Sequence, residues 1–189
     1  MRLRPALVLL VLLLPACGRD TPSGPAGPPV NTAQAAKLFD GRLRPLGWRV
    51  QRAELADQQY TSTTVPGRHH LAVYVRPVGT PTNADYVEGL ADVTKVFVPL
   101  VFDRYPEILS FDVCEEPTEA IDPSDEPKPV TQVLIRRDQL PMVDWRKATP
   151  REVVAGSTGH PNAVGLYISP ELRKSPEWIA VRPGSTPGG

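Results

Sequence analysis

The stretch PTNADYVEGLADVTKVF, residues 81–97, carries the clearest secondary-structure signal in the chain. Its apolar residues continue beyond Phe97 and recur at spacings of four, three, four, four and four, which places them on one face of a helix. These residues are Tyr86, Leu90, Val93, Phe97, Val101 and Tyr105. Thr82, with Asp85 three residues later, resembles a capping box. The pattern predicts one long amphipathic helix over about residues 83–105.

Pro99 lies inside this pattern. A proline in a helix interior removes a backbone hydrogen bond and clashes with the carbonyl four residues back, at a cost of about 3 kcal/mol. The sequence therefore predicts a kink or a break at Pro99. The β-branched residues just before it leave open a strand over residues 95–98.

Short runs of alternating or β-branched residues on both sides of this helix predict strands. The first two runs are residues 48–55 and 69–78. Between them, Pro66 and Gly67 predict the turn of an antiparallel hairpin. The other expected strands are residues 108–114, 130–137, 163–169 and 177–181.

Two short helices are indicated by their start signals. Asn31 or Thr32 caps the first, which we expect to end at Gly41. The second begins at Thr149, whose capping box is completed by Glu152. Strands of this size with one long helix between them predict an α+β fold, a mostly antiparallel sheet with that helix packed on it.

The composition fits a single small domain that does not bind nucleic acid. The 189 residues include 21 basic and 21 acidic side chains, so the formal net charge is +0 and there is no basic footprint. With 41% hydrophobic residues the chain can bury one core. We expect one α+β domain over residues 31–182 and a disordered tail over residues 183–189.

The N-terminus is built like an export signal. Two arginines in MRLRP precede an uninterrupted apolar run over residues 6–14. As a helix this run spans about 14 Å, well short of the roughly 30 Å of a bilayer's hydrocarbon core. We therefore expect a cleaved signal rather than a transmembrane anchor.

Leu14, Pro15, Ala16 and Cys17 resemble the lipobox of bacterial lipoproteins. In that family the cysteine sulfur receives a diacylglycerol, and signal peptidase II cuts just before it. The resemblance implies a signal peptide over residues 1–16, lipid attachment at Cys17 and a location on the extracytoplasmic face of the cell membrane. The alternative is an ordinary secretory signal in which the cysteine falls at this place by chance.

A tether follows the proposed cleavage point. Residues 18–30, GRDTPSGPAGPPV, are crowded with proline and glycine and have no apolar period. In a polyproline-like conformation they would reach on the order of 40 Å, enough to hold a domain clear of lipid headgroups. We assign residues 17–30 to the lipidated cysteine and this tether.

Cys114 is the only other cysteine, and it has no partner within the chain once Cys17 is lipidated. It shares one face of its expected strand with Ser110 and Asp112. We expect a covered and inert thiol, because cysteine is among the most often buried residues. A reactive thiol, or a disulfide between two molecules, stays open.

No cofactor or metal site is expected. Residues 115–126 hold six carboxylates, but they lack the glycine and the alternation of a calcium loop, so a solvated loop is the better interpretation. These are Glu115, Glu116, Glu119, Asp122, Asp125 and Glu126. His69 and His70 are neighbours on a strand and point to opposite faces, so they are poorly placed to bind one metal. The third histidine is His160.

GSTGHPN, residues 156–162, is the stretch most like a catalytic motif. Ser157 lies three residues before His160 and would be a nucleophile with its base. The stretch lacks the lysine of a phosphate loop and the spacing of G-x-S-x-G. We expect a glycine-rich turn and assign no catalytic residue.

The leading hypothesis is a membrane-anchored extracytoplasmic lipoprotein that acts as a binding or accessory module of the bacterial envelope, with an envelope protein as a possible partner. One alternative is an envelope hydrolase that uses Gly156–His160, and another is a structural subunit of a membrane complex. A binding module should show a pocket with apolar walls. An enzyme should bring Ser157 and His160 within hydrogen-bond reach, and a subunit should expose a large apolar patch.

Overall fold

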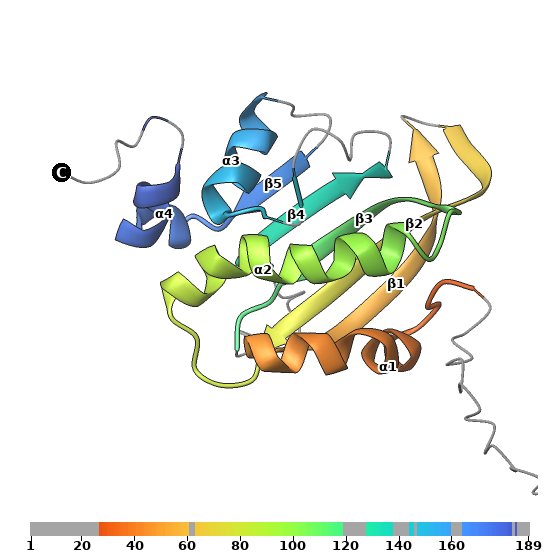
Figure 1. Cartoon of the computed structure of the whole chain (residues 1–189), viewed down its shortest axis with the longest axis horizontal. Coiled ribbons are helices and arrows are strands. Elements are labelled where there is room, and N and C mark those ends of the chain that lie inside the picture. The colour runs from red at the N-terminus through yellow and green to blue at the C-terminus, as the bar shows by residue number, and fades with distance from the viewer. Residues whose placement is uncertain are drawn as a thin grey trace, which may run out of the picture.

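The computed structural model describes residues 27–60, 63–118, 128–137, 144–145, 147–159, 164–182 and 184. They form a five-stranded sheet with helices packed against it (Figure 1). The helices are α1 (Thr32–Leu43), α2 (Asn83–Phe102), α3 (Pro150–Gly159) and α4 (Pro176–Val181), with 3-10 turns η1 (Arg44–Leu46) and η3 (Leu172–Lys174). The strands are β1 (Trp48–Tyr60), β2 (Thr63–Pro77), β3 (Ile108–Glu115), β4 (Thr131–Arg136) and β5 (Val164–Ile168).

The strands lie side by side in sequence order. β1 and β2 form an antiparallel hairpin, and β3, β4 and β5 also pair antiparallel, but β2 and β3 run parallel. Parallel neighbours need a long crossover, which α2 supplies. The expected α+β class is therefore confirmed, whereas the sheet is mixed rather than mostly antiparallel.

The described chain has four helices, whereas the expected fold had one long helix, over residues 83–105. α2 begins as predicted, because Thr82 and Asp85 each accept the other's backbone N–H in a capping box. It has 20 residues and ends at Phe102, so Tyr105 lies in the turn beyond it. The other three helices all contact α2, and the four therefore form one layer.

α2 runs through Pro99, so the predicted break and the alternative strand over residues 95–98 are wrong. Pro99 is exposed, while Phe97 and Val101 are fully buried. The backbone hydrogen bond that the proline removes therefore lies on the solvent side of the helix, where water can replace it.

The hairpin of β1 and β2 is confirmed, but its turn does not lie at Pro66 and Gly67. Both residues belong to β2, which begins at Thr63. Gly67 has a φ of 66°, and the pairing shifts register between Asp57 and Gln59. The proline and glycine thus mark an irregularity within a long strand pair rather than its turn.

Residues 177–181, expected to form a strand, belong to helix α4 instead. The Ser175 hydroxyl accepts the Trp178 N–H at 3.2 Å, and Pro176 occupies the first helical position. Both are helix-start signals, and they outweigh the β-branched residues that follow.

The predicted starts of α1 and α3 are confirmed, but their predicted ends are wrong. Asn31 accepts the N–H of the third residue of α1, and Thr149 and Glu152 bond each other's backbone N–H at the start of α3. α1 continues past Gly41, and α3 continues through Gly156. Neither glycine has the positive φ that ends a helix. Residues 156–159 of the expected glycine-rich turn are therefore helical, and residues 160–162 lie outside the described residues.

α1 closes the outer edge of β1. The Val50 N–H donates to Asp40 Oδ1 at 2.8 Å, and the Ala53 N–H donates to Thr32 Oγ1 at 3.2 Å. These side chains supply the acceptors that a further strand would otherwise provide. The edge of β1 is therefore satisfied from within the fold at two positions.

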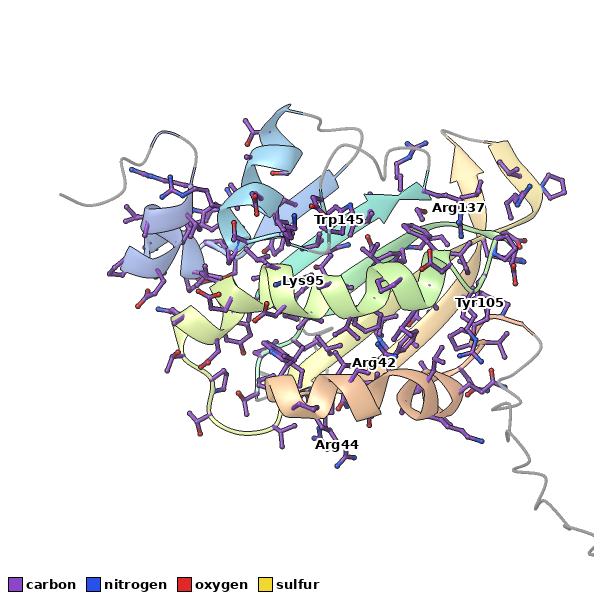
Figure 2. The ribbon with its side chains drawn as sticks, viewed as in Figure 1. Arg42, Arg44, Lys95, Tyr105, Arg137 and Trp145 are labelled. Atoms are coloured by element: carbon purple, nitrogen blue, oxygen red, sulfur yellow. The ribbon has the colours of Figure 1, made fainter. Side chains whose placement is uncertain are left out.

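Arg137 joins the end of α2 to the sheet (Figure 2). Its guanidinium donates to the carbonyl oxygens of Phe102 at 2.8 Å, Tyr105 at 2.6 Å and Ile108 at 2.8 Å. The last turn of α2 has no basic residue of its own, so Arg137 brings the positive charge that a helix C-terminus attracts. Burial lowers the pKa of Arg137 from its ordinary value.

A buried carboxyl lies where α2 packs on β3 and β4. Glu115 is 1% exposed, and Thr131 donates its hydroxyl proton to Oε2. Within the described residues Oε1 has no hydrogen-bond partner. A Cβ at Gly89 would collide with this oxygen, so glycine is required for the helix to lie so close. Burial raises the pKa of Glu115 well above its ordinary value, against the opposing effect of the Thr131 bond.

We expect Arg137→Ala to lower the free energy of unfolding by about 2–4 kcal/mol, because three carbonyl groups lose a charged donor. Arg137→Lys should recover only part of the loss, since an ammonium lacks the planar fork. Urea titrations measure both effects, and Arg173→Ala, which removes an exposed arginine, is the control. Equal losses in Arg137→Ala and Arg173→Ala would contradict this role.

We expect Glu115→Gln to become increasingly more stable than the native chain as the pH rises from 5 to 8. Above the ordinary pKa of 4.5 the unfolded chain releases the Glu115 proton while the folded chain keeps it. Native stability then falls by up to about 1.4 kcal/mol per pH unit until the folded pKa is reached. Unfolding titrations across this range test the difference. Glu88→Gln, at an exposed site on α2, is the control and should follow the same profile of stability against pH as the native chain. Parallel profiles for Glu115→Gln and the native chain would refute the expectation.

Candidate functional site

The sheet face that points away from the helices carries polar side chains close together. They come from alternate positions of β2 and β3. The residues between them point into the core and are buried: Leu71, Val73, Val75, Phe111 and Val113. The polar positions are His70, Tyr74, Arg76, Ser110, Asp112 and Cys114. Because the two strands are parallel neighbours, the register places His70 beside Ser110 and Tyr74 beside Cys114.

A chain of hydrogen bonds runs across three strands on this face. His70 Nδ1 lies 2.8 Å from Ser110 Oγ, and His70 Nε2 lies 3.2 Å from Asp112 Oδ2. Gln132 Nε2 donates to the same carboxylate oxygen at 3.0 Å. A serine, a histidine and a carboxylate in contact are the elements of an activated nucleophile. Ser110 is only 4% exposed, however, and within the described residues this row of hydrogen bonds joins β2, β3 and β4.

Cys114 is covered, in agreement with the sequence-based expectation. It is 2% exposed. Burial raises the pKa of its thiol to about 12, and the nearby carboxylate of Asp112 adds to the shift. The reactive thiolate is therefore scarce near neutral pH.

A groove of about 770 Å³ lies at the edge where β2 and β3 end, β4 begins and α2 begins. The carboxyl ends of parallel strands beside a helix N-terminus are a frequent place for ligand sites in proteins of mixed architecture. Its walls are formed by Thr80, Pro81, Asn83, Tyr86, Pro117, Thr118, Lys128, Pro129, Val130, Tyr167, Ser169, Pro170, Glu171 and Leu172.

Two tyrosines stand among the apolar walls of this groove. The Tyr86 hydroxyl donates to the Glu116 carbonyl at 3.3 Å, and burial raises the pKa of Tyr86. Tyr167 is half-buried. A smaller hollow of about 390 Å³ shares Tyr167 and Lys128 with the groove and reaches Gln132 on the open face. The groove therefore adjoins the polar face of the sheet.

The acidic stretch begins inside the fold rather than as a solvated loop. Glu115 and Glu116 are both buried, and Glu116 Oε2 lies 3.3 Å from a guanidinium nitrogen of Arg76. Part of the expectation for residues 115–126 is therefore wrong, because strand β3 continues into them. Residues 119–126 lie outside the described residues, and the solvated loop stays a prediction there.

The pair considered for the alternative hydrolase, Ser157 and His160, is described only at Ser157. Ser157 lies in α3 and donates its hydroxyl proton to the Val154 carbonyl at 2.8 Å. His160 lies outside the described residues, as does Cys17 with the whole of residues 1–26. The roles considered for these residues stay hypotheses.

The two neighbouring histidines have separate partners. His69 Nδ1 lies 3.5 Å from Asp57 Oδ1, whereas His70 contacts Ser110 and Asp112. Among the described residues, no three His, Cys, Asp or Glu side chains are arranged to hold a metal ion. None of the helices in the described part of the chain has the length and apolar character needed to cross a bilayer.

The sequence did not predict the groove, although two of its lining residues lie in elements that the sequence did predict. Tyr86 belongs to the apolar helical pattern, and Tyr167 belongs to an expected strand. Both line the groove because of the tertiary arrangement, above all the parallel pairing of β2 with β3, which no local pattern encodes. The contact between His70 and Asp112 depends on the same pairing, because both stand on the polar sides of correctly expected strands.

Known proteins offer no relative from which a role for the groove could be taken. No protein-family model matches the chain. No curated protein and no solved structure matches it either.

Proposed function

We propose that this chain is a membrane-anchored extracytoplasmic lipoprotein whose folded domain is a binding module of the bacterial envelope. The charged and apolar N-terminus and the lipobox-like residues 14–17 support the anchor. The single observation that supports the binding role is the groove at the carboxyl ends of β2 and β3.

The groove has the character of a ligand site. Its volume of about 770 Å³ falls within the range of roughly 300–1,000 Å³ that small-molecule pockets occupy. Prolines, aliphatic residues and two tyrosines supply apolar area, and Lys128, Asn83 and Thr118 supply a few polar groups. The polar lining also includes the carboxylate of Glu171 and the hydroxyl of Ser169.

An anchor and a groove act together in this proposal. A short flexible tether raises the effective concentration of a domain for partners on the same membrane to the millimolar range. A groove of modest size can therefore retain an envelope partner or ligand without a large interface. The hollow that continues toward Gln132 gives an extended ligand a path from the groove onto the polar sheet face.

Replacing Cys17 by serine is expected to abolish labelling with radioactive palmitate and to leave uncleaved precursor, since the thiol accepts the diacylglycerol in the family that the N-terminus resembles. Cys114→Ser is the matched control and should keep the label, because that thiol is buried in the domain. Labelling is read from whole cells after electrophoresis. Unchanged labelling of Cys17→Ser, or its loss in Cys114→Ser, would contradict the anchor.

Placing the photo-crosslinking residue p-benzoylphenylalanine at position 167 of the full chain in native membranes is expected to give a discrete adduct, because Tyr167 lines the groove. The matched control is the same residue at position 74, since Tyr74 is also half-buried on the open face but lines neither the groove nor its extension. The adduct should weaken when Cys17→Ser removes the anchor. Equal adducts at both positions, or none at position 167, would overturn the groove as the binding site.

A further inference from the structure

Glu115 is a buried carboxyl group with no cation beside it in the described chain. It alternates with core-facing Val113 on β3 and is 1% exposed. Thr131 donates a hydroxyl proton to Oε2, whereas Oε1 has no hydrogen-bond partner among the described residues. Oε1 fills the space that a side chain at Gly89 of α2 would otherwise occupy. A carboxylate in such a place lacks both water and a counter-charge, so the neutral acid is the form that fits.

The charged and titratable groups on the surrounding elements do not neutralise Glu115. Its titratable neighbours are Tyr86 on α2 and Cys114 on β3, and neither carries a positive charge. On β2, Arg76 is paired with Glu116 at 3.3 Å, and by strand alternation this pair lies on the opposite face of the sheet. β4 contributes only the hydroxyl already described. A negative charge on Glu115 would therefore stand uncompensated between α2 and the sheet.

The walls of the groove are connected to this carboxyl from three directions. Tyr86 lines the groove, and its hydroxyl donates to the Glu116 carbonyl at 3.3 Å. Val130 also lines the groove, and its N–H donates to the Glu115 carbonyl at 2.7 Å. Pro117 is a lining residue two positions beyond Glu115 in the chain. The walls contributed by α2 and by the segments next to β3 and β4 thus meet at Glu115 and its neighbour.

We propose that pH regulates the groove through Glu115, whose neutral form holds α2 against the sheet and whose ionised form loosens it; this rests on the groove being the binding site proposed above. An ionised Oε1 against Gly89 must gain water, and the first turns of α2 must move off the sheet to admit it. Tyr86, one turn before Gly89, moves with the helix and loses its bond to the Glu116 carbonyl. Burial raises the pKa of Glu115, so binding is strongest in acid and weakens as the pH rises through the folded pKa.

The test measures the position of α2 in the full chain carrying Cys17→Ser, so the result does not depend on the anchor. Nitroxide spin labels are attached at Ala84→Cys, in the first turn of α2, and at Arg173→Cys, on η3. Both positions are exposed, and neither lines the groove. The native Cys114 is buried and does not compete for the label. Pulsed electron paramagnetic resonance gives the distance between the two labels at a series of pH values from 5 to 9.

One distance should be present at low pH, and a second, longer distance should replace it as the pH rises. Glu115→Gln keeps the shape of the side chain without its charge, so it should hold the low-pH distance over the whole range. Thr131→Val removes a hydrogen bond that lowers the pKa of Glu115, so the transition should shift to higher pH. Glu88→Gln, at an exposed site on α2, is the matched control and should leave the transition in place.

The inference is overturned if the distance between the labels does not change from pH 5 to 9, or if Glu115→Gln shows the same change. It is also overturned if circular dichroism is lost over this range, because the whole domain then unfolds. Crosslinking from position 167 in native membranes reports the binding role separately, and its adduct should weaken over the same pH range except in Glu115→Gln. Movement of α2 with no adduct at any pH contradicts the binding role alone, whereas an adduct undiminished by the movement contradicts the regulation.

Discussion

β2 and β3 run in the same direction, and two parallel neighbours cannot be joined by a tight turn. The chain must return across the sheet, and α2 makes this return. The crossover brings the ends of both strands and the start of the helix to one edge, where the groove lies. Glu115 against Gly89 sets how closely α2 packs on the sheet, and Arg137 holds its other end. The position of the groove therefore follows from one strand pairing.

The groove borders a second, shallow hollow. Thr80 and Pro81 line both the groove and the shallow hollow that contains Leu46 and Val78. Both hollows lie at the edge where β2 ends and α2 begins.

The parts of the fold that follow from local chemistry were predictable from the sequence. Alternation of side chains identified strands such as β4, and the capping pair of Thr82 and Asp85 located the start of α2. Local signals failed where the tertiary environment outweighed them. Pro99 did not break α2, because its exposed position lets water replace the lost backbone hydrogen bond. The parallel pairing of β2 with β3 was beyond local patterns, because it joins residues about 40 positions apart, such as His70 and Ser110. The groove could not be expected without that pairing.

α1 closes the edge of β1 with two acceptors, Asp40 and Thr32, that precede the strand in the chain. Synthesis runs from the N-terminus, so these acceptors exist before the amides of Val50 and Ala53 that they will bind. An edge strand without a cover is a template for pairing with other molecules. The helix that covers the β1 edge therefore precedes that edge strand in the chain, so the cover is synthesised before the amides that need it.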